Sequence, residues 1–347
     1  MHFGNDGRGG TLVLMALAAV TLYVASRTAA GALARGAIGR PGLRAVGHWL
    51  PIAITSVVAV HLRKPEIAVA LAFSTSVASL SFVLGVLTYI APMDPPPASR
   101  RAWPFVLPAA LLALVAGFSG QFTWVHALAM LVLGGAVYSA WREAQARGEA
   151  ELPSPAGVAD AQPPARAWAV LAEVLLAAAL AVVGGWAAVS LASRAAATIP
   201  LVSTRLVAVA VLTPLLALPM LSSVAPEKAP AHSSSMASTL VAVALLNLCG
   251  LLPLLTIIWH LTAGASASPA VADAGITHFV TSVTTGAAAM PFPLATWRLD
   301  AVVLTVLGLA MVPVALGRGE LGRWEAIGLV AGYALYLALS AAVSVKM

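Results

Sequence analysis

Residues 66–91 read EIAVALAFSTSVASLSFVLGVLTYIA, and this stretch contains no charged side chain after Glu66. A helix that crosses the hydrocarbon core of a bilayer needs about 20 mostly apolar residues. The stretch is long enough to cross, and several hydroxyl side chains lie near its middle. It therefore predicts a membrane-spanning helix with polar groups inside it.

The rest of the chain has the same character. Of its 347 residues, 60% are hydrophobic and 9% are charged, whereas a soluble domain is about 45–50% apolar and about 25% charged. No soluble fold could cover so much apolar surface. We therefore expect nearly the whole chain to be embedded in a membrane, with the lipid bilayer as its main partner.

Ten apolar runs separated by short polar breaks predict ten spans. Residues 142–166 are rich in Pro, Ala and Glu, and they predict a flexible linker between a first five-helix repeat at 1–141 and a second at 167–347. The predicted fold is an all-α integral membrane protein with about ten transmembrane helices in two inverted repeats. The spans are expected at 11–26, 43–62, 66–91, 104–120, 122–141, 167–190, 199–225, 236–261, 299–316 and 324–343.

The distribution of basic residues predicts the orientation. With the N-terminus outside, 12 of the 19 Lys and Arg residues fall on the cytoplasmic side, as the positive-inside rule favours. The linker is then cytoplasmic, and a bacterial-type inner membrane is the expected location. Because the basic residues occur in ones and twos at the ends of apolar runs, the net charge of +6 does not indicate a nucleic-acid partner. The oligomeric state, including a homo-oligomer, stays open.

Short matches between the two halves support a repeat, which is a common construction of secondary transporters. An odd number of spans in each half would make the two repeats inverted. The matches are residues 25–27 with 192–194, residues 50–51 with 218–219, residues 73–76 with 236–239, and Gly134 with Tyr138 against Gly332 with Tyr336.

A site in such a fold is expected near the midplane, where prolines interrupt helices and free backbone carbonyls. Here each interrupting proline is followed by hydroxyl residues, and the next span of each half carries a second hydroxyl cluster. The alternative is that these hydroxyls only bond their own backbone or allow close helix packing. The candidate pathway residues are His48, Pro51, Thr55, Ser56, Ser74, Thr75, Ser76, Ser79, Pro219, Ser222, Ser223, Ser238 and Thr239.

The segments around these residues resemble the calcium/cation antiporter superfamily, typified by sodium/calcium exchangers. That family carries Gly-Thr-Ser-Leu-Pro-Glu and Gly-Ser-Asn-Ile-Phe-Asn segments in each of two repeats. Residues 47–52 and 215–220 are similar to the first segment, and residues 74–79 and 237–242 to the second. The resemblance implies ten helices in two repeats, and cation exchange as the activity.

The departures from the family pattern lie at the residues that bind the ion. Ile52 and Met220 stand where the family has glutamates, and the 13 Asp and Glu residues avoid the middle of every predicted span. Ca²⁺ requires six to eight oxygen ligands with carboxylates among them, so ordinary Ca²⁺ exchange is not expected. A monovalent cation such as Na⁺, K⁺ or H⁺ can be held by hydroxyls and carbonyls.

Other polar residues receive structural interpretations. We expect Arg298 and Asp300 to form an interfacial ion pair, and Cys249 to be a core residue. His126 and His260 lie beside tryptophans near span ends, which indicates interfacial anchoring, while His48 is either a proton relay or a hydrogen-bonded helix-end residue. Residues 262–296 read as an extracellular lid or a re-entrant helix. No cofactor and no metal site are expected.

Three functions compete for this sequence. A transporter predicts a cavity at the midplane lined by hydroxyls, whereas an exchanger-like scaffold or partner subunit without transport activity predicts that Ile52 and Met220 close that space by apolar packing. An intramembrane enzyme would need a nucleophile with a base or a metal-ligand cluster. Neither pattern occurs in the sequence, so an enzyme is not expected.

Overall fold

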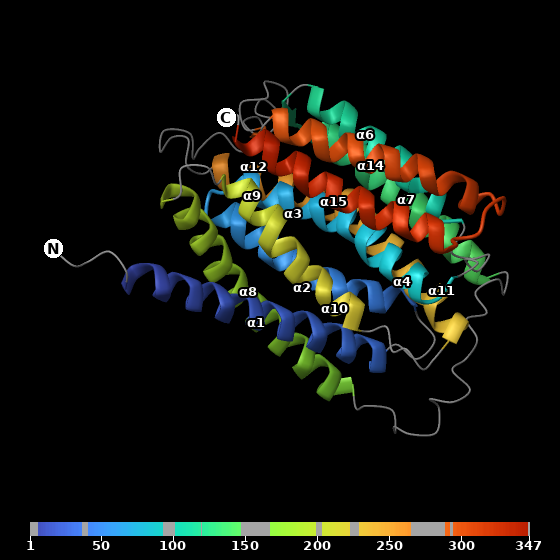
Figure 1. Cartoon of the computed structure of the whole chain (residues 1–347), viewed down its shortest axis with the longest axis horizontal. Helices are drawn as coiled ribbons and strands as arrows, with labels where there is room; N and C mark the ends of the chain where they lie inside the picture. The colour runs from blue at the N-terminus through green and yellow to red at the C-terminus, as the bar shows by residue number, and fades with distance from the viewer. Residues whose placement is uncertain are drawn as a thin grey trace, which may run out of the picture.

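The computed structural model describes ten helical spans (Figure 1). It describes residues 6–36, 41–92, 101–118, 120–146, 167–198, 203–222, 229–264, 289–291 and 294–345. The predicted linker beyond Ala146, and the predicted lid apart from its two ends, lie outside the described residues.

Five spans come from the first half of the chain. The third of them is one continuous helix with a π-helical segment, η1, in its middle. The bounds are α1 at Asp6–Gly36, α2 at Pro41–His61, α3 at Pro65–Val77, η1 at Ala78–Val83, α4 at Leu84–Ile90, a 3-10 turn η2 at Trp103–Phe105 leading into α6 at Val106–Phe118, and α7 at Trp124–Ala146.

The second half supplies five more spans, and two of them contain π-helical segments. The bounds are α8 at Ala167–Thr198, α9 at Thr204–Val207, η3 at Ala208–Leu212, α10 at Thr213–Ser222, α11 at Ala229–Leu246, η4 at Asn247–Leu251, α12 at Leu252–Gly264, α14 at Leu294–Ala315 and α15 at Arg323–Val345. Two short antiparallel strands, β1 at Gln121–Phe122 and β2 at Met290–Pro291, join the halves.

The prediction of ten helical spans is confirmed, although several spans are longer than expected. By length and composition, eight of the described helices can cross a membrane. Of the other two, α6 is a shorter apolar helix, and α2 has 21 residues but carries Arg44, His48 and His61. The span that contains the first interrupting proline therefore also carries three polar side chains.

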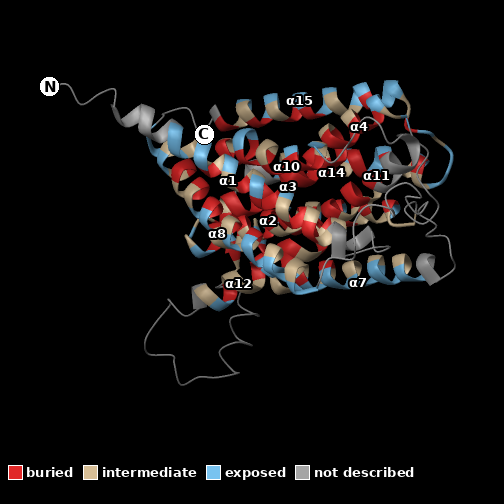
Figure 2. Ribbon diagram, turned by 90° about the horizontal axis from the view of Figure 1, so that it is seen from below, coloured by how far each residue is buried: buried red, intermediate tan, exposed pale blue. Residues whose placement is uncertain are grey.

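The helices form a buried centre and a lipid-facing periphery. Almost all residues in the most apolar stretch of the span Pro65–Ile90 are buried, and Figure 2 shows α3 and α10 in the buried interior, while α7 and α15 carry exposed outer faces. The exposed side chains of the periphery are mostly large and apolar, as a helix facing lipid requires. The helices α1 and α8 pack along each other at one edge (Figure 1).

Helices of one half pack on helices of the other in a reciprocal pattern. The first helix of each half contacts the second span of the opposite half, α1 against α10 and α8 against α2. The last helix of each half contacts the third span of the opposite half, α15 against α4 and α7 against α12. The two halves are therefore intertwined, and neither forms a separate core.

Aromatic and basic residues cluster where α12 ends. His260 stacks on Trp124 with ring centroids 5.4 Å apart, and Arg63 lies 5.6 Å from the ring centroid of Trp259 and donates to the backbone oxygen of Thr262. This arrangement resembles an aromatic belt with a cation, which anchors helices at a membrane surface.

Candidate functional site

The hydroxyls of the central helix are buried and bonded to their own backbone. Ser74, Thr75, Ser76 and Ser79 are at most 1% exposed, and each donates to the carbonyl four residues earlier, at Ala70, Leu71, Ala72 and Thr75 respectively. Hydroxyls that donate to their own backbone keep their lone pairs available. This row therefore presents acceptors to its surroundings.

Two of these hydroxyls also contact polar residues from the second half. Ser74 Oγ lies 2.5 Å from Thr213 Oγ1, and the amide Nδ2 of Asn247 donates to Thr75 Oγ1 at 2.9 Å. All four residues are buried. We call Ser74, Thr75, Thr213 and Asn247 the hydroxyl–amide cluster.

The hydroxyl–amide cluster lies where the helices depart from α-helical geometry. Asn247 is the first residue of η4, and Thr213 directly follows η3 and donates to the carbonyl of Ala208, five residues earlier. A π-helical segment leaves backbone groups outside the regular pattern and often occurs at functional sites. Three of the central spans thus carry their irregular turns close to one polar cluster.

The carbonyl oxygen of Asn247 has no hydrogen-bond partner among the described residues, although Asn247 is fully buried. The amide orientation follows from its neighbour: the hydroxyl proton of Thr75 is given to Leu71, so Thr75 Oγ1 can only accept, and the Asn247 NH₂ must face it. A buried acceptor without a donor costs about 1–3 kcal/mol. A cation would satisfy it.

The predicted residues on α2 are buried, but they are placed differently. Thr55 donates to the Pro51 carbonyl at 2.8 Å and packs against Gly185 of α8, where an added Cβ would lie 3.1 Å from the Thr55 Cα. His48 Nδ1 and Ser56 Oγ have no hydrogen-bond partner among the described residues. These residues are interior, and their recorded contacts do not join them to the hydroxyl–amide cluster.

The predicted residues of the second half are more scattered. Pro219 and Thr239 are buried, Ser238 is half-buried, and Ser222 is exposed and donates to the Pro219 carbonyl at 2.9 Å. Ser223 lies outside the described residues. Of the predicted hydroxyls, only Ser74 and Thr75 belong to the hydroxyl–amide cluster; Thr213 and Asn247 had not been predicted.

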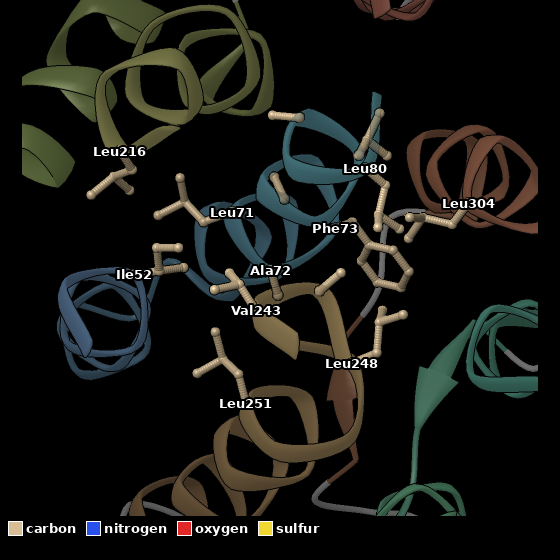
Figure 3. Close-up of a cluster of buried hydrophobic side chains, with 14 of the residues drawn as sticks. Ile52, Leu71, Ala72, Phe73, Leu80, Leu216, Val243, Leu248, Leu251 and Leu304 are labelled. Atoms are coloured by element: carbon tan, nitrogen blue, oxygen red, sulfur yellow. The ribbon is translucent and has the colours of Figure 1, made fainter. Parts of the chain in front are cut away.

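Apolar side chains fill both positions where the resembling family has glutamate. Ile52 is fully buried and Met220 is 1% exposed. Figure 3 shows Ile52 of α2 directed at the apolar side chains Leu71 and Val243, and Ser79 Oγ contacts Met220 Sδ at 3.7 Å. Among the described residues, no group of three or more His, Cys, Asp or Glu could hold a metal.

The interpretation of Asp300 as part of an interfacial pair with Arg298 is wrong. Asp300 is 2% exposed and forms an ion pair with Arg205 of α9, while the hydroxyl of Tyr336 donates to the same carboxylate oxygen at 3.0 Å. Arg298 is exposed instead. The sequence separation between Arg205 and Asp300 concealed the pairing, since only the fold brings their helices together.

Comparisons with known proteins identify the fold. No protein-family profile matches the chain, and no curated protein is detectably similar in sequence. Solved structures of the sodium–calcium exchanger NCX_Mj do match. One, soaked with 2.5 mM Na⁺ and 1 mM Sr²⁺, superposes with a TM-score of 0.61 at 17% identity, covering 94% of this chain and 97% of that one.

Other states of the same exchanger give similar values. The structure soaked with zero Na⁺ and Ca²⁺ has a TM-score of 0.57 at 17% identity, covering 95% of this chain and 98% of that one. The structure soaked with 10 mM Na⁺ and zero Ca²⁺ has a TM-score of 0.60 at 16% identity, covering 94% of this chain and 98% of that one. The predicted resemblance is confirmed at the level of architecture: this chain has the fold of a calcium/cation antiporter-like membrane protein.

Proposed function

We propose that this protein is a secondary active transporter, an antiporter of a monovalent cation such as Na⁺, K⁺ or H⁺. The observation that carries the proposal is the unpartnered Asn247 carbonyl oxygen in the buried hydroxyl–amide cluster. Polar groups at the centre of a membrane protein are expensive and mark ion pathways. The likeness to solved sodium–calcium exchangers supports the same class of function.

The charge of the cluster favours a monovalent ion over Ca²⁺. The amide and the three hydroxyls are neutral, and Ile52 and Met220 supply no carboxylate. Dehydrating Ca²⁺ requires several oxygens, including carboxylates, to offset its two charges. Neutral oxygens suffice for a singly charged ion, so this chain is expected to differ from Ca²⁺ exchangers in its substrate.

We further propose that the chain comprises two inverted five-helix repeats, 1–141 and 167–347, joined by a cytoplasmic linker, with the N-terminus outside a bacterial-type inner membrane. The reciprocal packing of α15 on α4 and α7 on α12 supports the repeat. Inverted repeats suit alternating access, because the two halves can exchange conformations around a site between them.

The second candidate function is a scaffold or partner subunit without transport activity. The apolar packing of Ile52 and Met220 favours it, because it removes the charged ligands and fills their positions. An enzyme has less support, since the described residues hold no cluster of metal ligands.

Uptake into proteoliposomes separates the two candidates. Purified protein is reconstituted, Na⁺ or H⁺ gradients are imposed, and uptake of labelled Na⁺, K⁺ and Ca²⁺ is followed with Asn247→Leu as the test variant. Ser81→Ala is the matched control, since Ser81 is a buried hydroxyl on the span that carries Ser74 and Thr75, and it donates to the Val77 carbonyl rather than to the hydroxyl–amide cluster.

Gradient-driven flux of a monovalent ion that Asn247→Leu abolishes and Ser81→Ala retains supports the transporter. Absence of flux for all three ions overturns it in favour of the scaffold. Flux of Ca²⁺ alone would overturn the argument from the neutral cluster.

A further inference from the structure

Three helices of the second half meet at one buried carboxylate. Arg205 at the start of α9 forms an ion pair with Asp300 of α14, and Tyr336 of α15 donates to the same oxygen. The three residues are 4%, 2% and 1% exposed, respectively. We call Arg205, Asp300 and Tyr336 the ion-pair network.

Fold stability alone does not account for such a network. A buried ion pair loses much of its attraction to desolvation, and replacing both partners by apolar residues of similar size is often neutral or stabilising. Ionisable groups inside a membrane are rare and mark functional elements. What the network provides is a fixed position for α9 relative to α14 and α15.

One arm of the network leads directly to the hydroxyl–amide cluster. Arg205 lies on the continuous span Thr204–Ser222, which also carries Thr213 and its contact with Ser74. Only eight residues, about two turns including η3, separate Arg205 from Thr213, so a displacement of Arg205 is expected to move Thr213. The ion pair therefore restrains the position of Thr213.

The other arm reaches the helix that carries Ser74. Tyr336 lies 6.1 Å from Tyr333 between ring centroids, and Tyr333 stacks on Phe82 of η1 at 5.3 Å. The same two helices approach closely at Gly85, where an added Cβ would lie 2.9 Å from Val330 Cγ2. The position of α15 is thus fixed against the central helix.

Together the two arms link Arg205, through three helices, to both sides of the contact between Ser74 and Thr213. We propose that Arg205, Asp300 and Tyr336 are positioning residues, which set the spacing between Ser74 and Thr213 and thereby the affinity of the cation site. This inference rests on the proposed transport function. A substitution that loosens the ion-pair network should therefore move the residues of the hydroxyl–amide cluster but remove none of their oxygen atoms.

The first test measures KM and kcat for uptake of the transported monovalent ion. Tyr336→Phe removes one hydrogen bond and keeps the ring, and Arg205→Met with Asp300→Leu removes both charges together, so that folding is preserved. Tyr138→Phe is the matched control, because Tyr138 is 60% exposed on the lipid-facing helix α7. Both test variants are expected to raise KM about threefold to tenfold with little change in kcat. A KM within about twofold of wild type in both variants overturns the inference.

The second test is independent of transport. Cys249, the only cysteine, is 5% exposed and lies on η4 two residues after Asn247, so its labelling by N-ethylmaleimide in membranes reports how tightly this region is packed. Faster labelling in both test variants, with Tyr138→Phe unchanged, supports the positioning role. If the wild type transports no ion but both test variants are labelled faster, the proposed function is wrong and the positioning role of the network is still supported. If the wild type transports no ion and labelling is unchanged in the test variants, the positioning role of the network is overturned as well.

Discussion

Replacing Asn247 by leucine should raise the stability of the ion-free protein and at the same time abolish ion binding. The change keeps the size and shape of the side chain but removes the amide that bonds Thr75 Oγ1 at 2.9 Å and the carbonyl oxygen that has no partner among the described residues. Thr75 keeps its bond to the Leu71 carbonyl. The substitution therefore leaves no new unsatisfied group.

The change in the free energy of unfolding follows from two opposing contributions. A hydrogen bond between membrane helices contributes about 0.6 kcal/mol on average, and this is lost. Removal of a buried unsatisfied acceptor returns about 1–3 kcal/mol. The ion-free variant should therefore be more stable than the wild type by about 0.5–2 kcal/mol, which is the usual relation between a functional polar group and stability.

Thermal unfolding in detergent, with and without added Na⁺ or K⁺, measures both effects. A ligand at 100 times its Kd stabilises the folded state by about 2.7 kcal/mol, so the wild type should gain stability with the bound ion and the variant should not. Ser81→Ala should respond to the ion as the wild type does. A variant that is less stable than the wild type without ion, or that is still stabilised by the ion, refutes the assignment of Asn247 as a ligand.

Three other substitutions test the cluster and the packing of the helices elsewhere in the fold. Thr213→Val removes the hydroxyl that contacts Ser74 Oγ and should lower stability by less than about 1 kcal/mol while reducing uptake in proteoliposomes; unchanged uptake would argue against this residue. Ile52→Glu places a carboxylate among apolar side chains and should lower the free energy of unfolding by roughly 3–5 kcal/mol. Thermal unfolding measures this loss, and added Ca²⁺ should restore part of it; an unchanged stability would mean that water reaches this position. Gly47→Ala puts a Cβ 2.7 Å from the Ala30 Cα and should destabilise by about 1–3 kcal/mol, whereas Gly135→Ala, with nothing within 4 Å, should not; equal effects would contradict the close contact of α1 and α2.

The helices could be predicted from the sequence because each span must by itself be long enough and apolar enough to cross the bilayer. An apolar run of sufficient length specifies a span whatever its neighbours are. The ends were less well predicted: α1 extends over Asp6–Gly36 rather than 11–26, and α8 continues to Thr198 rather than 190. Helices continue beyond the hydrocarbon, and hydropathy does not report where they stop.

Half of the hydroxyl–amide cluster could not be found by searching for hydroxyl-rich stretches. Thr213 is an isolated hydroxyl in an apolar run, and Asn247 stands alone between leucines. A signal did exist for Asn247, since it is one of only two asparagines in the chain and a lone amide within a span is costly. The partners of Asp300 gave no such signal, because ion pairing depends on which helices become neighbours.

The irregular helical turns indicate how the two halves correspond. The π-helical segments of the third spans begin at Ala78 and Asn247, and 247 − 78 gives an offset of 169. The prolines Pro51 and Pro219 are offset by 168, which agrees closely, whereas the sequence match of 73–76 with 236–239 implies 163. At an offset of 168, Asn247 corresponds to Ser79. Each of these two residues lies on the π-helical segment of its own half and contacts the other half, Asn247 at Thr75 and Ser79 at Met220. The proposed repeat would thus place a neutral polar side chain at equivalent positions on both sides of the candidate site.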